Sequence, residues 1–192
     1  MSDAVSTRDY NGLSIPTPGT FSIDPTHSRV GFMVRHLMVS KVRGSFTDVV
    51  GEIVVGEDPT QSSVTATIQA LSITTGVEQR DGHLRTGDFL EVEKYPTLEF
   101  RSTGVTAVDG NEFTLAGELT IKDITKPVVL KVEFEGATRS PYGKDVFGFT
   151  ATTEIDREDW GITYNMALET GGVMVSKNVK IEIEGEAIRN DA

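Results

Sequence analysis

The chain has 192 residues, of which 18 are Lys or Arg and 29 are Asp or Glu, so its formal net charge is −11 at neutral pH. An overall field of this sign repels nucleic acid and anionic membranes, and nucleic-acid binding is therefore disfavoured. The chain contains no Cys, which excludes disulfides, thiolate metal sites, cysteine nucleophiles and thiol redox motifs.

Residues 1–19 are polar, contain Pro16 and Pro18, and include no apolar run of signal-peptide length. Such a segment has no apolar face of its own to bury, so it predicts a flexible N-terminal arm ahead of one barrel domain over residues 20–190. No stretch approaches the roughly 20 consecutive apolar residues of a membrane-spanning helix. We therefore expect a cytoplasmic protein that does not span a membrane.

Residues 25–47 reverse the sign of the charge, because they hold basic and histidine side chains and no Asp or Glu. In the same segment Val30, Phe32 and Val34 alternate with polar positions, which is the period of a strand with one apolar and one polar face. A ligand with a long apolar body and an anionic or polar head would find a complement to both halves here. The basic and histidine side chains of this segment are His27, Arg29, Arg35, His36, Lys41 and Arg43.

The remainder of the chain repeats this alternation of apolar and polar side chains, which is typical of strands that bury one face. The ribbon over residues 42–55 switches its inward face near Asp48, which predicts a β-bulge. Turn signals such as Asp109-Gly110-Asn111 separate the strands. Because these connections are short, the strands that they join must be antiparallel neighbours. The other clear strands are predicted over residues 64–70, 98–100, 113–121, 128–134, 147–151 and 179–183.

Residues 78–92 lack the strand period and predict a short helical insert near residues 78–90, with Leu84 and Phe89 packing inward. About eight antiparallel strands with one apolar face must close or fold double. The predicted fold is all-β, an extended eight-stranded antiparallel barrel whose lumen can hold one small ligand.

Four blocks of the sequence form a long and specific signature. The first covers residues 21–46 and begins Phe-Ser-Ile-Asp-Pro-Thr-His-Ser-Arg-Val-Gly-Phe. The second holds Thr75-Gly76 and residues 80–90, then Tyr95-Pro96 and Phe100. The third is residues 117–122 with 125–128, and the fourth is Gly148-Phe149 with residues 155–157 and Trp160-Gly161. Together these blocks, spread over about residues 21–188, resemble the YceI-like, polyisoprenoid-binding family.

The resemblance implies a lipocalin-like barrel that holds one long-chain amphiphilic lipid in its lumen, often as a homodimer. It implies no enzymatic activity and no cofactor other than the lipid ligand. A polyisoprenoid, isoprenoid quinone, isoprenoid diphosphate or fatty lipid would be bound for transport, storage or sequestration. Asp123 stands where the family pattern has Gly, and residues 176–178 replace a usually acidic turn; both departures lie at predicted turns, away from the lumen.

We predict a ligand site made of an apolar group for the tail and a polar group for the head. The simpler alternative is that the apolar residues are ordinary core and the basic residues are solvated. The apolar candidates are Phe32, Val34, Phe89, Phe100, Phe113, Phe149 and Trp160, and the head-group candidates are His27, Arg35, His36 and Arg85.

Two other function classes stay open. A small hydrolase or metal-dependent enzyme is disfavoured, because the three His have neither the i,i+2 nor the i,i+4 spacing of a ready metal site and no Gly-x-Ser-x-Gly motif is present. A stress-response partner protein with an empty barrel is the third class. Native mass spectrometry would separate the three, because a co-purifying lipid, a bound metal and an empty chain differ in mass.

Overall fold

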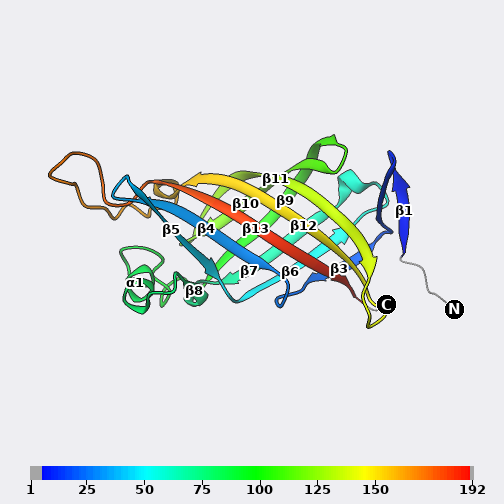
Figure 1. Ribbon diagram of the computed structural model, residues 1–192, viewed down its shortest axis with the longest axis horizontal. Helices are drawn as coiled ribbons and strands as arrows, with labels where there is room; N and C mark the ends of the chain where they lie inside the picture. Colours follow the sequence, from blue (N-terminus) through cyan, green and yellow to red (C-terminus); the bar gives the residue numbers. More distant parts are fainter. Residues whose placement is uncertain (1–5, 191–192) are drawn as a thin grey trace.

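The protein is described here by a computed structural model, which covers residues 6–190 and is an elongated barrel of antiparallel strands (Figure 1). One short α-helix and three 3₁₀ turns accompany the strands. In chain order the elements are β1 (Thr7–Tyr10), β2 (Leu13–Pro16), β3 (Gly19–Ile23), β4 (Arg29–His36), β5 (Ser40–Phe46), β6 (Val49–Val55), β7 (Ser63–Gln69), β8 (Ile73–Thr74), α1 (Glu78–Leu84), β9 (Thr97–Asp109), β10 (Glu112–Ile121), β11 (Ile124–Arg139), β12 (Asp145–Asp156) and β13 (Asn178–Arg189), with the 3₁₀ turns at Pro59–Gln61, Ala70–Ser72 and Arg157–Trp160.

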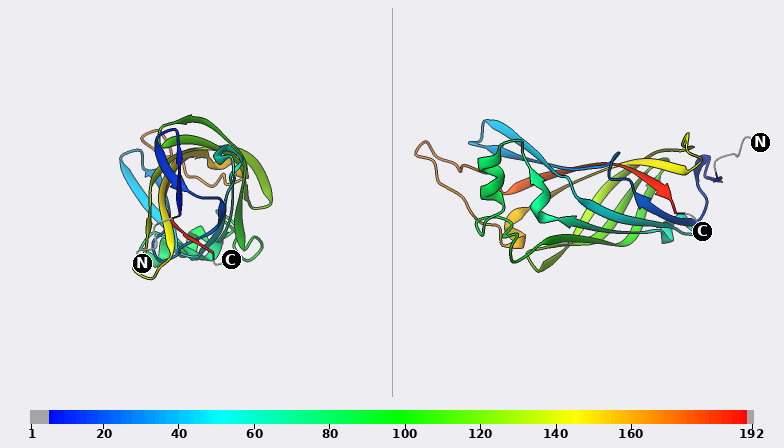
Figure 2. Two further views of the ribbon diagram at one scale, coloured as in Figure 1. Left: turned by 90° about the vertical axis from the view of Figure 1, so that its right-hand side faces the viewer. Right: turned by 90° about the horizontal axis from the view of Figure 1, so that it is seen from below.

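Eight barrel strands result, because three of them are each built from two consecutive elements. β3 and β4 both pair with β13, through residues 187–189 and 180–184 of that strand, and so act as one interrupted strand. β5 continues into β6 and β7 into β8 in the same way. The pairing of β12 with β13 closes the sheet, and the strands form a ring when viewed along the long axis (Figure 2). The predicted eight-stranded antiparallel barrel is confirmed.

The predicted bulge lies at Thr47 and Asp48, between β5 and β6. Phe46 and Val49 both line the barrel interior although they are three residues apart. Side chains on a regular strand alternate between faces, so two inward residues at odd spacing require the ladder to be interrupted between them.

The turns gather at the two ends of the barrel. The helix end carries α1, the β4–β5 turn, the β10–β11 turn and the segment of residues 161–177 (Figures 1 and 2). The hairpin end carries the β1–β2 hairpin and residue 190, the last described residue.

The structure has the β1–β2 hairpin where the sequence predicted a flexible arm over residues 1–19. Residues 1–5 of that arm lie outside the described residues. Ile15 is only 9% exposed, and the guanidinium of Arg8 donates hydrogen bonds to the carbonyls of Gly56 and Glu57. The amide of Ser6 donates to Asp145 Oδ2 at 3.2 Å. The hairpin is ordered because it packs on an apolar surface at the end of the barrel. The local sequence of the hairpin carries no information about that surface.

Helix α1 confirms the predicted insert, but it ends at Leu84, and turns continue the chain to β9. Asp81 attaches the helix to the end of β8, since Asp81 Oδ2 accepts from the Thr74 hydroxyl at 3.1 Å and Asp81 Oδ1 accepts from the amide and the hydroxyl of Thr75 at 2.8 and 2.6 Å. Burial raises the pKa of Asp81, but the hydrogen bonds from Thr75 and Thr74 outweigh it and hold that pKa below its usual value.

Among residues 6–190, no helix has the length and apolar character needed to cross a lipid bilayer.

Candidate functional site

The interior of the barrel contains a cavity of about 520 Å³. Its wall is formed mainly by inward-facing aliphatic and aromatic side chains from the barrel strands, with the β1–β2 hairpin at one end and α1 at the other. Many of these residues are only partly buried, Phe32, Phe100 and Phe113 among them, because their inner faces border the cavity. An apolar cavity of this size falls in the range that takes small-molecule ligands.

Three phenylalanine rings are held against the wall by glycines on the neighbouring strand. Phe32 lies over Gly44 and Phe149 lies over Gly185, each pair being direct cross-strand partners. Phe100, whose direct partner on β10 is Leu119, reaches diagonally over Gly117 of the same strand. A Cβ atom at any of these glycines would overlap the facing ring. The missing side chains therefore let the rings lie along the wall, which leaves the lumen open.

The basic side chains that line the cavity all come from the helix end. They are supplied by β4, by α1 and by the 3₁₀ turn after β12, and they are His36, Arg80, His83 and Arg157. Val175 connects two of them, since its backbone pairs with His36 and its carbonyl accepts from Arg157 Nη2 at 3.4 Å. The cavity is thus apolar along its length and positively charged at one end.

Arg157 is the most buried of these side chains, at 4% exposure. Its guanidinium donates to three backbone carbonyls, those of Ser176 at 3.0 Å, Ile162 at 2.7 Å and Val175 at 3.4 Å. Burial lowers the pKa of Arg157, although Glu158 and Asp156 act in the opposite direction. Among the described residues no carboxylate forms an ion pair with it, so it presents a buried positive charge whose hydrogen bonds are made to neutral groups.

Helix α1 positions Arg80 and His83. Arg80 Nε donates to the Thr75 hydroxyl at 2.7 Å. His83 Nε2 lies 2.8 Å from Asp88 Oδ2, and the His83 ring packs edge-on against Phe89 and Tyr164 at centroid distances of 5.1 and 5.0 Å. Both side chains are therefore oriented by neighbours before any ligand is present.

The structure places most of the predicted site residues in the cavity wall. Those that line it are Phe32, Val34, His36, Phe89, Phe100, Phe113 and Phe149. The four that do not line it are His27, Arg35, Arg85 and Trp160.

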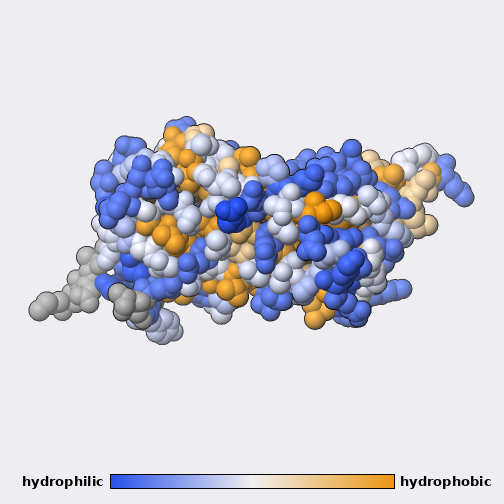
Figure 3. Space-filling model, turned by 180° about the vertical axis from the view of Figure 1, so that it is seen from behind, coloured by the Kyte–Doolittle hydropathy of each residue, from blue (hydrophilic) through white to orange (hydrophobic). Residues whose placement is uncertain are grey.

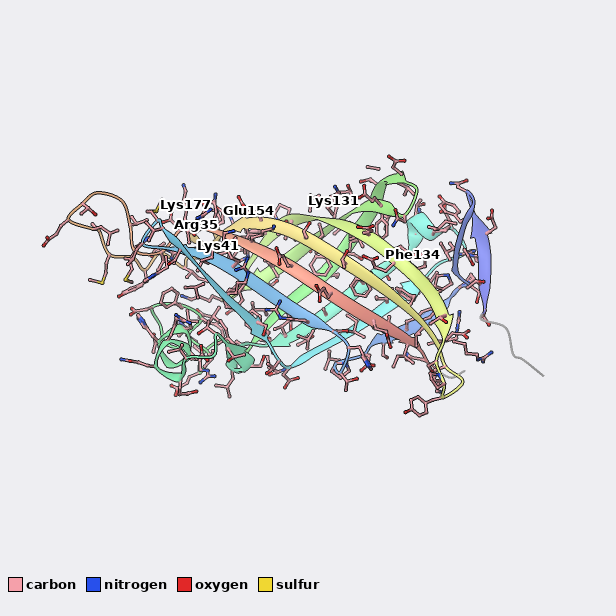
Figure 4. The ribbon with its side chains drawn as sticks, viewed as in Figure 1. Arg35, Lys41, Lys131, Phe134, Glu154 and Lys177 are labelled. Carbon is pink, nitrogen blue, oxygen red and sulfur yellow. The ribbon has the colours of Figure 1, made fainter. Side chains whose placement is uncertain are left out.

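Strand alternation accounts for Arg35, because Val34 and His36 face inward and the residue between them must face outward (Figure 4). Arg85 turns away from the cavity: it donates to the carbonyls of Leu71 and Ile73 and approaches Glu78 at 3.4 Å. Trp160 is 2% exposed and belongs to the packed core, where its indole donates to the Leu119 carbonyl at 3.0 Å.

His27 lies outside the barrel in the link between β3 and β4, where Asp24 Oδ2 is 2.7 Å from its Nδ1 and Glu186 Oε1 is 3.9 Å away. The hydrogen bond with Asp24 raises the pKa of His27, and the charges of Asp24 and Glu186 add to this effect. The same bond lowers the pKa of Asp24. The pair joins the two halves of the interrupted strand and does not contribute to the cavity.

Arg80, His83 and Arg157 were not among the predicted site residues. Each has an acidic residue within five positions in the sequence. This spacing is typical of a solvated ion pair and does not by itself indicate a site. The signal that points to Arg157 is its position in the fourth sequence block, after a strand that faces the lumen.

Comparison with known proteins agrees with this architecture. Residues 21–187 match the model of the YceI-like domain. The chain is 43% identical over 171 residues to UPF0312 protein SA2479 of Staphylococcus aureus, covering 86% of this chain and 95% of that protein.

Two solved structures share the fold. The YCEI protein of Campylobacter jejuni has a TM-score of 0.71 and 28% identity, with 82% of this chain and 90% of that chain covered. A domain from Saccharophagus degradans, described as a polyisoprenoid binding domain, has a TM-score of 0.63 and 14% identity, with 91% and 100% covered. The sequence match and the barrel together place this chain in the YceI-like family.

Proposed function

We propose that the barrel binds one long-chain amphiphilic lipid, with the hydrocarbon tail in the lumen and the head group at the helix end. The observation that carries the proposal is the polarity of the cavity, which is apolar along its length and has its basic side chains at one end. The Saccharophagus degradans domain, which has the same fold, is described as binding polyisoprenoid, and this supports the same ligand class here.

The tail supplies most of the binding free energy in this proposal. Each methylene transferred from water to an apolar wall contributes roughly 0.8 kcal/mol. A wall of hydrocarbon side chains selects for length and bulk, so polyisoprenoids, isoprenoid quinones and fatty lipids all fit the chemistry.

The head group faces His36, Arg80, His83 and Arg157 in this proposal. These side chains donate hydrogen bonds, and Arg157 adds a buried charge that no described carboxylate neutralises. Diphosphate, carboxylate and carbonyl oxygens are the acceptors such donors prefer. The bound lipid would be carried, stored or sequestered, because the wall shields its tail from water.

Native mass spectrometry of freshly purified protein tests the proposal. A mass increment that corresponds to one lipid, identified after organic extraction, is the expected result. The mass of the bare chain, obtained under conditions that preserve lipid complexes of another barrel protein, would contradict it and favour a partner protein with an empty barrel.

A further inference from the structure

The β4–β5 turn projects from the helix end (Figure 1). It presents three successive apolar side chains to solvent. Leu37 is 40% exposed, Met38 55% and Val39 80%. At the hairpin end the turns of residues 56–59 and 109–111 contain polar and turn-forming residues, and the β11–β12 turn exposes one large aromatic side chain, that of Tyr142. Apolar residues at the end of a projecting turn are too far from the barrel core to be buried in it.

The backbone conformation of this turn does not explain why apolar residues occupy these positions. Leu37 and Met38 have φ values of 51° and 63°, and the Val39 amide donates to the His36 carbonyl at 3.1 Å. Turns with positive φ at both central residues favour Asn and Gly, because positive φ is costly for bulky side chains. Leu and Met at these positions therefore point to a role at the surface.

A second segment extends the same apolar surface. The Leu37 amide donates to the Met174 carbonyl at 2.8 Å, so the turn lies against residues 165–175. In that segment Met166 is 55% exposed and Val173 36%, on either side of a turn apex that carries the exposed polar residues Glu169 and Thr170. We refer to the five exposed side chains as the apolar tip. In Figure 3 hydrophobic atoms are visible on the projecting loops at the right, set back from a hydrophilic outermost point. The tip consists of Leu37, Met38, Val39, Met166 and Val173.

A group of cations lies behind this tip, in a protein whose net charge is strongly negative. Arg35 and Lys41 are direct cross-strand partners on β4 and β5, and like charges in that position repel each other. Neither of them forms an ion pair with any described residue. Lys177 lies near them and pairs with Asp156 at 3.6 Å (Figure 4). We call Arg35, Lys41 and Lys177 the basic collar.

We propose that the apolar tip and the basic collar dock this end of the barrel onto a lipid membrane that carries anionic head groups. In this arrangement the tip enters the interface and the collar contacts the phosphates, as in other interfacial proteins that combine apolar and basic groups. The net charge of −11 does not prevent docking, because salt screens charges beyond about 8–10 Å and the collar is the closest part to the membrane.

A second copy of the chain fits this surface less well. A symmetric contact through the same patch would bring two basic collars together, and repulsion between them would oppose it. The surface also lies at the end of the cavity that carries His36 and Arg157. Docking there would bring the cavity's basic end close to the lipid head groups. The proposal goes beyond lipid binding by the barrel and does not require it.

Sedimentation with vesicles tests docking. The full chain is mixed with vesicles of phosphatidylcholine alone or of phosphatidylcholine with phosphatidylglycerol, at low and high salt. Val39→Asp probes the tip and Arg35→Gln with Lys41→Gln probes the collar. Val129→Asp and Lys131→Gln are matched controls, since both residues are exposed on β11. Lys131 lies on the outer wall away from the tip (Figure 4).

The wild type should sediment with the anionic vesicles, and less at high salt. Each basic side chain near an anionic surface contributes about fivefold to the partition, so the double collar variant should lose about twenty-fold or more. Val39→Asp should lose a similar factor, and the controls should bind as the wild type does. Circular dichroism verifies that each variant is folded.

Docking is contradicted by a wild type that stays in the supernatant, by equal binding to neutral vesicles, or by equal losses in the control variants. Native mass spectrometry of the same preparations keeps the two proposals separate. Lipid retained in a chain that binds no vesicle would overturn docking alone, and vesicle binding by a chain that never holds lipid would overturn the proposed function alone.

Discussion

The Phe149 ring lies directly over Gly185, its partner across the ladder between β12 and β13. Because glycine has no Cβ atom, the ring occupies the space where a side chain would otherwise stand. The ring stays against the wall and its free face borders the cavity. The width of the lumen at this level thus depends on a residue that does not itself line it.

Gly185→Ala should push the Phe149 ring into the lumen and weaken lipid binding. Overpacking of this kind costs about 1–3 kcal/mol, and the same cost taken from the binding free energy is a loss of about five- to 150-fold in affinity. Gly104→Ala is the control, because a Cβ atom there meets nothing within 4 Å. A fluorescent fatty acid or isoprenoid titrated into each variant measures the effect. Restoration by Phe149→Leu in the Gly185→Ala background would identify the ring as the cause, and equal affinity in both glycine variants would contradict the explanation.

Carboxylates placed in the lumen should abolish lipid binding while the barrel survives. Val34→Asp combined with Phe113→Asp puts two charges into the cavity wall, and an apolar tail cannot compensate their loss of hydration. Val50→Asp combined with Val129→Asp is the matched control on the outer face, where these residues are 69% and 57% exposed. Lipid extracted per mole of folded protein is the measurement. Unchanged lipid in the lumen variant would place the ligand elsewhere.

Arg80→Gln should weaken an anionic amphiphile more than a neutral one of the same length. A hydrogen bond to a charged group contributes about 1.5–3 kcal/mol, so the anionic ligand should lose about tenfold or more. Arg35→Gln should change neither affinity, because Arg35 faces away from the cavity. Isothermal titration with a matched pair of ligands measures both variants. Equal losses of the two ligands in Arg80→Gln would show that Arg80 supports the fold.

His27 should titrate above the ordinary histidine value of 6.5, because Asp24 raises its pKa. Since the folded pKa is the higher one, the stability contributed by protonated His27 is fully present below pH 6.5 and is lost as the pH rises through the folded pKa. NMR titration of the imidazole measures the shift. In Asp24→Asn the pKa should fall back toward 6.5, and a value that does not move would contradict the assignment. Denaturation midpoints of the wild type and His27→Gln should converge at alkaline pH.

The barrel could be predicted because its strands alternate. The apolar positions in β10, β11 and β13 face the lumen as the sequence indicated, and the odd spacing between Phe46 and Val49 marked the bulge. Alternation alone would also have placed Arg35 outside, between Val34 and His36. The reversal of charge in residues 25–47 favoured Arg35 as a head-group ligand. The basic side chains of one strand are, however, divided between its inner and outer faces.

The rest of the site depends on contacts that are distant in sequence. Arg157 is held by carbonyls from residues 162–176, and a run such as Asp156-Arg157-Glu158 does not by itself indicate burial. The β1–β2 hairpin has two strands of four residues and gains its order from the barrel end. Neither arrangement has a local pattern that predicts it.

Four residues of the β1–β2 hairpin form part of the cavity wall, Tyr10, Leu13, Ile15 and Pro16, and they cover the end opposite the basic side chains. In the proposed lipid complex, a cavity covered at this end limits the length of the tail that fits. A tail whose head group stays with the basic residues reaches the hairpin at one particular length, and a longer tail must fold back or displace the hairpin. The position of the hairpin would then set the length of the lipid tail that fits, and changing the size of Ile15 should change which tail lengths are bound.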